Sequence, residues 1–214
     1  MYFSYGEKEK NYLKEQDPLL GQVIDLVGHI QRPVNPDLFS SMVHQIVSQQ
    51  ISTASKTTIW NRMEDRLGNI TVDSILSQSQ EELQSFGITF RKAGYITDFA
   101  NRVKEGSLDL VKLRSLGDEE VIKELCKING IGPWTAQMVL IFSMQRPNVI
   151  SFGDLAIRKG MGIVYGLEKL NKSKFDELSL VYSPYATVAG LYLWAVAGGA
   201  VPLGRDPKQI NRKF

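Results

Sequence analysis

Two glycines and a proline near the middle of the chain constrain its fold most strongly. An amphipathic segment ends at Gly130, the turn Gly130-Ile131-Gly132 follows, and Pro133 opens a second apolar segment. Glycine at both ends of the turn permits positive φ and a close approach of another backbone. Proline suits the first helical position, because the amide that it lacks would have no helical partner there. The pattern predicts a helix-hairpin-helix in which Ile131 packs back between the two helices.

The amides of such a hairpin would point outward together. Amides clustered at a helix N-terminus bind anions such as phosphate, and phosphate contacts fix register on a duplex without reading its sequence. A Gly-x-Gly turn alone is more often a plain corner between packed helices. Here DNA binding is favoured by Pro133, Thr135 and Ala136, which follow the turn, and by the carboxylate of Asp154 a short loop further on. The residues expected to contact the DNA backbone are Gly130, Ile131, Gly132 and Thr135.

Apolar residues elsewhere recur at helical spacing, and caps and glycines bound the segments. Asp37, Ser79, Thr89 and Asp118 are the predicted N-caps. No strand pattern persists, so we predict an all-α protein of about ten helices. Besides the hairpin pair, the predicted helical ranges are 7–13, 18–30, 38–47, 54–67, 80–87, 90–104, 155–165, 174–182 and 184–198.

Composition excludes several classes of protein. With 214 residues, 43% of them hydrophobic, the chain can bury a core. It has neither an apolar run that spans a bilayer nor a signal peptide, so we expect a cytoplasmic protein, associated with the nucleoid if bacterial. The single cysteine, Cys126, excludes an internal disulfide, and we expect it to be a buried, unreactive thiol. We expect a structural role for His44, and no metal site.

The net charge of +2 argues little for nucleic acid by itself. Its distribution is more informative, because Arg91-Lys92 and Arg158-Lys159 are basic pairs. The C-terminal tail sets four basic residues against Asp206, namely Arg205, Lys208, Arg212 and Lys213. Charged runs are usually solvated faces, so these patches only support a DNA-binding interpretation.

Four segments together carry a resemblance to a known family. Residues 128–136 resemble the hairpin of the helix-hairpin-helix DNA glycosylases, the HhH-GPD superfamily, and residues 152–159 resemble the segment with their essential aspartate. The likeness extends to residues 45–52 and 184–194. Within the superfamily the chain is most similar to the alkylation-repair branch, 3-methyladenine DNA glycosylase II. The ordered motifs are specific in combination, although each alone is weak.

The resemblance implies a two-lobed helical fold in one glycosylase unit. We expect residues 36–110 to form the lobe with the DNA wedge, residues 111–199 the lobe with the hairpin and the catalytic aspartate, and residues 200–214 a basic tail. Some relatives carry a β-sheet lobe before these helices, and residues 1–35 are too few for it. We expect a monomer that acts on double-stranded DNA containing alkylated bases.

A polar interruption between two apolar helices contains Gln49, Gln50 and Ser52. Such a glutamine pair is commonly a solvent-facing bend. By resemblance, this loop is the wedge that enters the minor groove and fills the gap left by an extruded nucleotide. Gln50 falls at the inserting position, where many family members have leucine. A glutamine can stack by its amide plane and hydrogen-bond to the orphaned base.

Asp154 is the candidate for the chemistry. An aspartate at the start of a helix is ordinarily an N-cap. Its place after the hairpin, between Gly153 and the basic pair, favours catalysis. Glycosidic cleavage passes through an oxocarbenium-like state, which a carboxylate stabilises, and the same group can orient the attacking water.

An alkylated purine already carries positive charge, so it leaves without protonation by a second acid and needs aromatic faces on which to stack. Tryptophan at helical spacing is more often core, and we keep that interpretation for Trp60. The resemblance places Trp134 and Trp194 in the base pocket. It adds Met138 and Leu155, which stand where some relatives have tyrosines, so a less aromatic pocket is expected.

Two further expectations concern chemistry that the chain lacks. Bifunctional relatives have a lysine nucleophile two residues beyond the second hairpin glycine, where this chain has Trp134, so no AP-lyase step is expected. Iron–sulfur relatives need four cysteines. No cofactor is therefore expected, apart from a monovalent cation that the hairpin carbonyls could bind.

Three classes of function compete at this stage. The leading one is a monofunctional glycosylase for alkylated bases. The second is a non-catalytic helix-hairpin-helix module that only holds the DNA backbone, which leaves Asp154 and the two tryptophans unexplained. The third, a helical protein unrelated to nucleic acid, leaves the ordered motifs unexplained.

Overall fold

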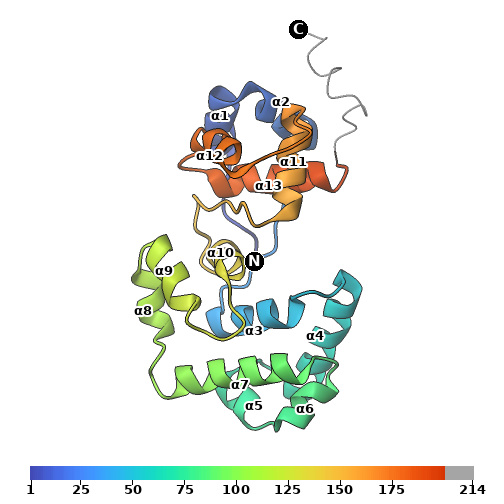
Figure 1. The fold of residues 1–214 in the computed structure, drawn as a ribbon, viewed down its shortest axis with the longest axis vertical. Coiled ribbons are helices and arrows are strands. Elements are labelled where there is room, and N and C mark those ends of the chain that lie inside the picture. The colour runs from blue at the N-terminus through green and yellow to red at the C-terminus, as the bar shows by residue number, and fades with distance from the viewer. Residues whose placement is uncertain (201–214) are drawn as a thin grey trace. The chain divides into compact units, whose positions relative to one another are not determined.

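A computed structural model describes residues 1–200 and shows thirteen α-helices in this part of the chain (Figure 1). The described residues form no strand, only an isolated antiparallel bridge between Tyr2 and Pro33. The all-α prediction is confirmed. The sequence pattern missed α5 (Val72–Leu76) and α8 (Leu110–Ser115), because helices of five and six residues are too short to show a helical period.

The backbone contacts divide the chain into two compact units. The central unit is Asn35–Met144, and the terminal unit combines Met1–Val34 with the chain from Gln145 onward. This division differs from the lobes predicted from the sequence, which separated the wedge from the hairpin near residue 110. The hairpin lies in the same unit as the wedge, because α10 (Pro133–Phe142) packs on α3 (Leu38–Ser48) and on α9 (Asp118–Leu125).

The central unit is built around α3, which contacts α4 (Thr53–Leu67), α7 (Phe90–Lys104) and α10. Phe39 of α3 stacks on Phe99 of α7 with ring centroids 5.0 Å apart. Ile46 and Val47 of α3 are fully buried beside this pair of helices. The remaining helices of the unit are α4 (Thr53–Leu67), α5 (Val72–Leu76), α6 (Gln80–Ser85), α7 (Phe90–Lys104) and α8 (Leu110–Ser115).

Local capping rules set most helix starts in the central unit. The side chains of Asp37, Ser79 and Thr89 accept first-turn amides of α3, α6 and α7, as predicted. The predicted cap Asp118 is instead the first residue of α9. Gly117 takes the N-cap position, and its amide donates to the Glu120 carboxylate at 3.1 Å.

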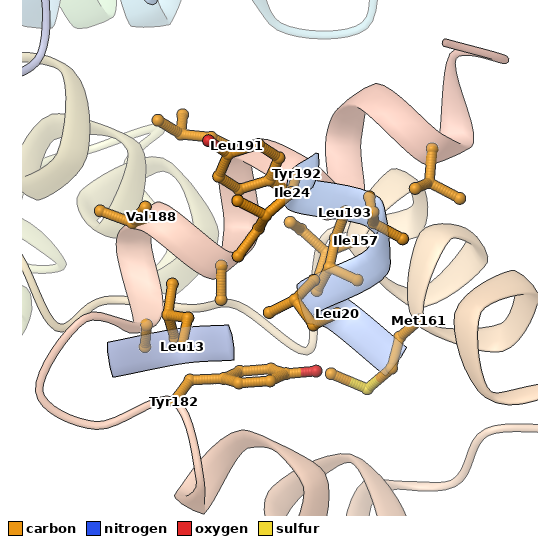
Figure 2. Close-up of a cluster of buried hydrophobic side chains, with 14 of the residues drawn as sticks. Leu13, Leu20, Ile24, Ile157, Met161, Tyr182, Val188, Leu191, Tyr192 and Leu193 are labelled. Atoms are coloured by element: carbon orange, nitrogen blue, oxygen red, sulfur yellow. The ribbon is translucent and has the colours of Figure 1, made fainter. Parts of the chain in front are cut away.

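The terminal unit joins the first helices of the chain to the last ones. Its helices are α1 (Glu7–Gln16), α2 (Pro18–Val27), α11 (Leu155–Tyr165), α12 (Lys172–Leu180) and α13 (Ala186–Ala197). Helix α13 is apolar on nearly all sides and almost wholly buried, as expected for a central core helix. Figure 2 shows this core, in which α13 contributes Val188, Leu191, Tyr192 and Leu193.

Helices α11 and α13 approach so closely that the crossing point needs a glycine. A Cβ on Gly160 would lie 2.1 Å from the carbonyl oxygen of Leu193. Nearby, Asp17 caps α2 through its Oδ1, and its Oδ2 accepts a hydrogen bond from the Tyr165 hydroxyl. Tight backbone packing and a buried polar contact therefore hold α11, the helix that follows Asp154, in place.

Candidate active site

The two hairpin glycines have different roles. Gly130 has φ +82°, and a Cβ there would lie 2.2 Å from Cδ2 of Tyr95, so only glycine fits. Gly132 has φ −100° and ψ 175°, and no heavy atom lies within 4 Å of the position of its Cβ. Gly132 therefore does not use the positive φ that a glycine permits, and the described residues leave the space beside it open, so a close approach of a DNA backbone there stays a prediction. Ile131 is buried, as expected.

The start of α10 lacks a capping side chain. Gly132 occupies its N-cap and, as a glycine, has no side chain that could accept the first-turn amides. Uncapped amides at a helix N-terminus suit a phosphate. Thr135 was also predicted to contact the DNA backbone. Its side chain is buried, so only its main-chain amide could make that contact.

The wedge turn, residues 49–51, connects α3 to α4 and separates the three predicted wedge residues by role. Gln50 is exposed and has φ +55°, a conformation that is uncommon for a non-glycine residue. The Gln49 side chain instead donates to the Gly130 carbonyl at 2.7 Å. Ser52 caps α4 by accepting the Ser55 amide at 3.1 Å. Only Gln50 therefore presents a side chain that the fold does not use.

A lysine that sequence reasoning treated only as part of a basic pair supports this turn. Lys92 Nζ donates to the carbonyl oxygens of Val47 at 2.8 Å and Gln49 at 2.6 Å. Burial, and then the charge of Arg91, lower the pKa of Lys92. Phe90 begins the same helix and is 53% exposed, an aromatic surface that the sequence analysis did not single out.

The two predicted pocket residues of the central unit differ in exposure. Trp134 is 40% exposed at the start of α10. Met138 is 3% exposed and belongs to the buried face of the same helix. Trp134 can therefore offer a ring to a ligand, whereas Met138 is buried and its place in the base pocket stays a prediction.

In the terminal unit, Asp154 is the N-cap of α11. Its Oδ1 accepts the amides of Ala156 at 2.9 Å and Ile157 at 3.0 Å. The side chain is thus oriented by the helix, and the helix N-terminus favours its negative charge. Both cap bonds use one oxygen, so Oδ2 is not needed for the cap. The residue is only 8% exposed.

Arg32 and Trp194 belong to the same cluster as Asp154. The Arg32 guanidinium carbon lies 5.4 Å from the centroid of the Trp194 ring, which is within cation–π range. Burial lowers the pKa of Arg32, and the charge of Asp154 opposes that effect. The terminal unit therefore brings together the predicted carboxylate and the predicted tryptophan, and adds an arginine that no sequence motif indicated. Leu155, the fourth predicted pocket residue, is 73% exposed.

The sequence predicted structural roles for His44, Trp60 and Cys126, and the structure agrees with these predictions only in part. His44 packs edge-on against Trp60 with centroids 4.8 Å apart, and burial, then Lys56, lower its pKa to about 4. Trp60 itself is partly exposed rather than core, and its indole nitrogen donates to Glu64 at 2.7 Å. Cys126 is half-buried rather than buried, and burial raises the pKa of its thiol.

The sequence analysis also made predictions about metal sites, membrane-spanning helices and the basic C-terminal tail. Residues 1–200 contain no cluster of three or more His, Cys, Asp or Glu side chains suited to a metal ion. The Gly130 carbonyl already accepts the Gln49 amide, and a monovalent cation at the hairpin carbonyls stays a prediction. No described helix is both long and apolar enough to cross a membrane. The basic tail residues Arg205, Lys208, Arg212 and Lys213 lie outside the described residues.

A helix-hairpin-helix whose second helix begins at a glycine N-cap, and a buried aspartate that caps a later helix, are the features expected of the helical base-excision DNA-repair proteins. Residues 43–183 match the family described as HhH-GPD superfamily base excision DNA repair protein. The chain belongs to this family.

Individual relatives agree with this assignment. The chain is 34% identical to a DNA-3-methyladenine glycosidase from Bacillus halodurans, with a TM-score of 0.86 over 99% of both chains. It is 27% identical to a Schizosaccharomyces pombe 3-methyladenine DNA glycosylase in complex with abasic DNA, with a TM-score of 0.80 over 93% of this chain and 100% of that one. A Bacillus subtilis relative is 30% identical over 73% of the chain, which spans only 58% of that relative's length.

Proposed function

We propose that the chain is a monofunctional DNA glycosylase of base excision repair. It extrudes alkylated purines of the 3-methyladenine type from duplex DNA and hydrolyses their N-glycosidic bonds. The observation that carries the proposal is the buried carboxylate of Asp154, which is held at a helix N-terminus and acts electrostatically on Arg32, the arginine that lies against Trp194. The names of two solved relatives, a DNA-3-methyladenine glycosidase and a 3-methyladenine DNA glycosylase, support the substrate class.

Asp154 would act through the negative charge of its carboxylate. The two amide bonds to Oδ1 fix the carboxylate before the substrate arrives, so little reorganisation is needed during the reaction. A fixed negative charge beneath the sugar stabilises the oxocarbenium-like state, and the same carboxylate can orient the water that adds to C1′. An alkylated purine departs as a neutral base, so the reaction needs no acid to protonate it.

The exposed ring of Trp134 is the strongest candidate for binding the extruded base. A tryptophan face attracts a cationic base more strongly than a neutral one. Trp194 contributes in another way, because one cation, Arg32, is already within cation–π range of its ring. Met138 is buried, so Trp134 in the central unit and Leu155 in the terminal unit are the predicted pocket residues whose side chains are exposed.

Hydrolysis without a lyase step is supported by the partners of the nearby lysines. A β-lyase needs an amine that reaches C1′. Lys127 Nζ is bound to the Glu124 carboxylate at 2.7 Å, and Lys159 Nζ donates to the Ala197 carbonyl at 3.0 Å. Neither lysine extends from the hairpin position, which Trp134 occupies. We propose that the product is an intact abasic site.

DNA binding would use the N-terminus of α10, whose N-cap is Gly132, for phosphate and Gln50 for insertion. We propose that the protein binds DNA as a monomer.

The direct test is incubation of the protein with methylated duplex DNA and measurement of the released bases by chromatography. We expect release of 3-methyladenine by the wild-type protein and loss of release by Asp154→Asn. If neither protein releases a base while both bind duplex DNA, the chain is instead a non-catalytic DNA-backbone-binding module.

A further inference from the structure

The Gln49 side chain joins two parts of the central unit that lie 81 residues apart in the sequence. Its Nε2 donates to the Gly130 carbonyl at 2.7 Å and lies 3.4 Å from Oγ1 of Thr135. The first acceptor belongs to the hairpin turn, and the second belongs to the first turn of α10. Gln49 itself is the C-cap of α3 and the first residue of the wedge turn.

The hairpin end of this bridge cannot move freely. Gly130 has a positive φ, and the ring of Tyr95 fills the space where its side chain would be. Tyr95 belongs to α7, the helix that also carries Lys92. The Gly130 carbonyl is therefore a fixed acceptor for the Gln49 amide.

The wedge end of the bridge is held from the other side. Lys92 Nζ donates to the backbone carbonyl of Gln49 at 2.6 Å, while the side chain of Gln49 reaches the hairpin. The next residue, Gln50, takes the left-handed conformation, which a non-glycine residue keeps only when its surroundings determine it. Residue 49 is thus anchored through its backbone and its side chain, immediately before the exposed Gln50.

We propose that Gln49 is a positioning residue that fixes the wedge turn to the hairpin, rather than a residue that enters the DNA. The hairpin holds a phosphate and Gln50 inserts, so a fixed spacing between them sets which base step receives the wedge. Such preorganisation removes the cost of ordering the turn when DNA binds. This inference rests on the proposed function and assigns one part of its DNA-recognition step.

The test replaces Gln49 by residues of similar length. Gln49→Met removes the donor without adding charge, and Gln49→Glu places a carboxylate against the Gly130 carbonyl. Gln49→Lys returns an N–H donor with similar reach and serves as the rescue variant. Gln84→Glu, on the exposed surface of α6, controls for added negative charge within the same unit.

Three quantities are measured for each variant: the melting temperature, the Kd for undamaged duplex, and the Kd for a duplex with one abasic site. We expect Gln49→Met and Gln49→Glu to lower the preference for abasic over undamaged DNA by about 5- to 30-fold, the range for one lost hydrogen bond. The Kd of Gln49→Met for undamaged duplex should stay within about twofold, because the phosphate-binding amides are intact. Gln49→Lys should recover most of the preference, and Gln84→Glu should keep it.

The inference is overturned if Gln49→Met melts like the wild type and keeps the wild-type preference. It is equally overturned if the variants lose affinity for both duplexes alike and Gln49→Lys recovers neither, because that pattern marks a purely structural residue. The proposed function is tested separately by base release. A wild-type protein that releases no base, with variants that still lose the abasic preference, would contradict the function and retain the positioning role.

Discussion

A Cβ placed on Gly130 would lie 2.2 Å from Cδ2 of Tyr95, so the Tyr95 ring leaves no room for a side chain at this position of the hairpin turn. The second hairpin glycine, Gly132, faces open space. We therefore expect Gly130 to be needed for folding of the hairpin and Gly132 to be needed for binding of DNA.

Alanine substitutions at the two glycines should have opposite signatures. Gly130→Ala combines a positive φ with a steric clash and should destabilise the fold by roughly 1–3 kcal/mol or more. Gly132→Ala should cost at most about 1 kcal/mol, the penalty of alanine at an N-cap, yet weaken duplex binding because a methyl group then meets the phosphate. Thermal unfolding and fluorescence anisotropy measure the two effects.

The loss of affinity in Gly132→Ala should be the same for every duplex, because phosphate contacts are independent of sequence. Wild-type affinity should also fall steeply with salt through counterion release. Loss of binding to only one sequence or one lesion would show that Gly132 approaches a base and not the backbone.

Acid should destabilise the central unit through His44. Burial, and then the charge of Lys56, lower its folded-state pKa to about 4 from an ordinary 6.5. Between these values the unfolded chain binds more protons than the folded one, so stability falls as the pH drops below about 6.5. Between pH 7 and pH 5 we expect the wild type to lose roughly 2 kcal/mol more than His44→Gln. Denaturant unfolding at both pH values measures this difference, and equal losses would contradict it.

Borohydride should not trap the protein on DNA. The hairpin position of a lyase lysine holds Trp134, and Lys127 and Lys159 have partners on the protein. Incubation with methylated duplex should therefore leave abasic sites that break only after alkali or heat. The measurement is gel electrophoresis with and without borohydride. A cross-linked band, or breaks without alkali, would show that one of the lysines leaves its partner to attack the sugar.

Local sequence rules were sufficient for much of this structure. The helix period predicted the all-α fold, and the short reach of a capping side chain made Asp37, Ser79 and Thr89 recognisable. Asp154 was recognised by its motif, and its cap geometry follows the same rule.

Contacts between residues far apart in the sequence could not be predicted from local sequence rules. Arg32 lies outside the recognised motifs, and only the packing of the chain brings it to Trp194. Gln49 looked like a wedge residue because nothing in its neighbourhood reveals a carbonyl acceptor 81 residues away. Met138 follows Trp134 by one helical turn, yet one is buried and the other exposed, and a periodic pattern alone does not separate them.

The central claim is that Asp154 performs chemistry in addition to capping α11. Asparagine is as good an N-cap as aspartate, so Asp154→Asn should keep the fold, while Asp154→Ala should lose about 1 kcal/mol of stability. The two variants therefore distinguish the cap from the charge.

The most direct measurement is the single-turnover rate of base release from methylated duplex by Asp154→Asn, beside its Kd for abasic-site DNA. We predict a rate lower by about 10²-fold or more, the loss expected on removing one preorganised electrostatic stabiliser. The melting temperature should be close to that of the wild type, and the Kd should stay within a few-fold. A variant that releases bases at a near-normal rate would contradict the catalytic role and leave Asp154 as a helix cap.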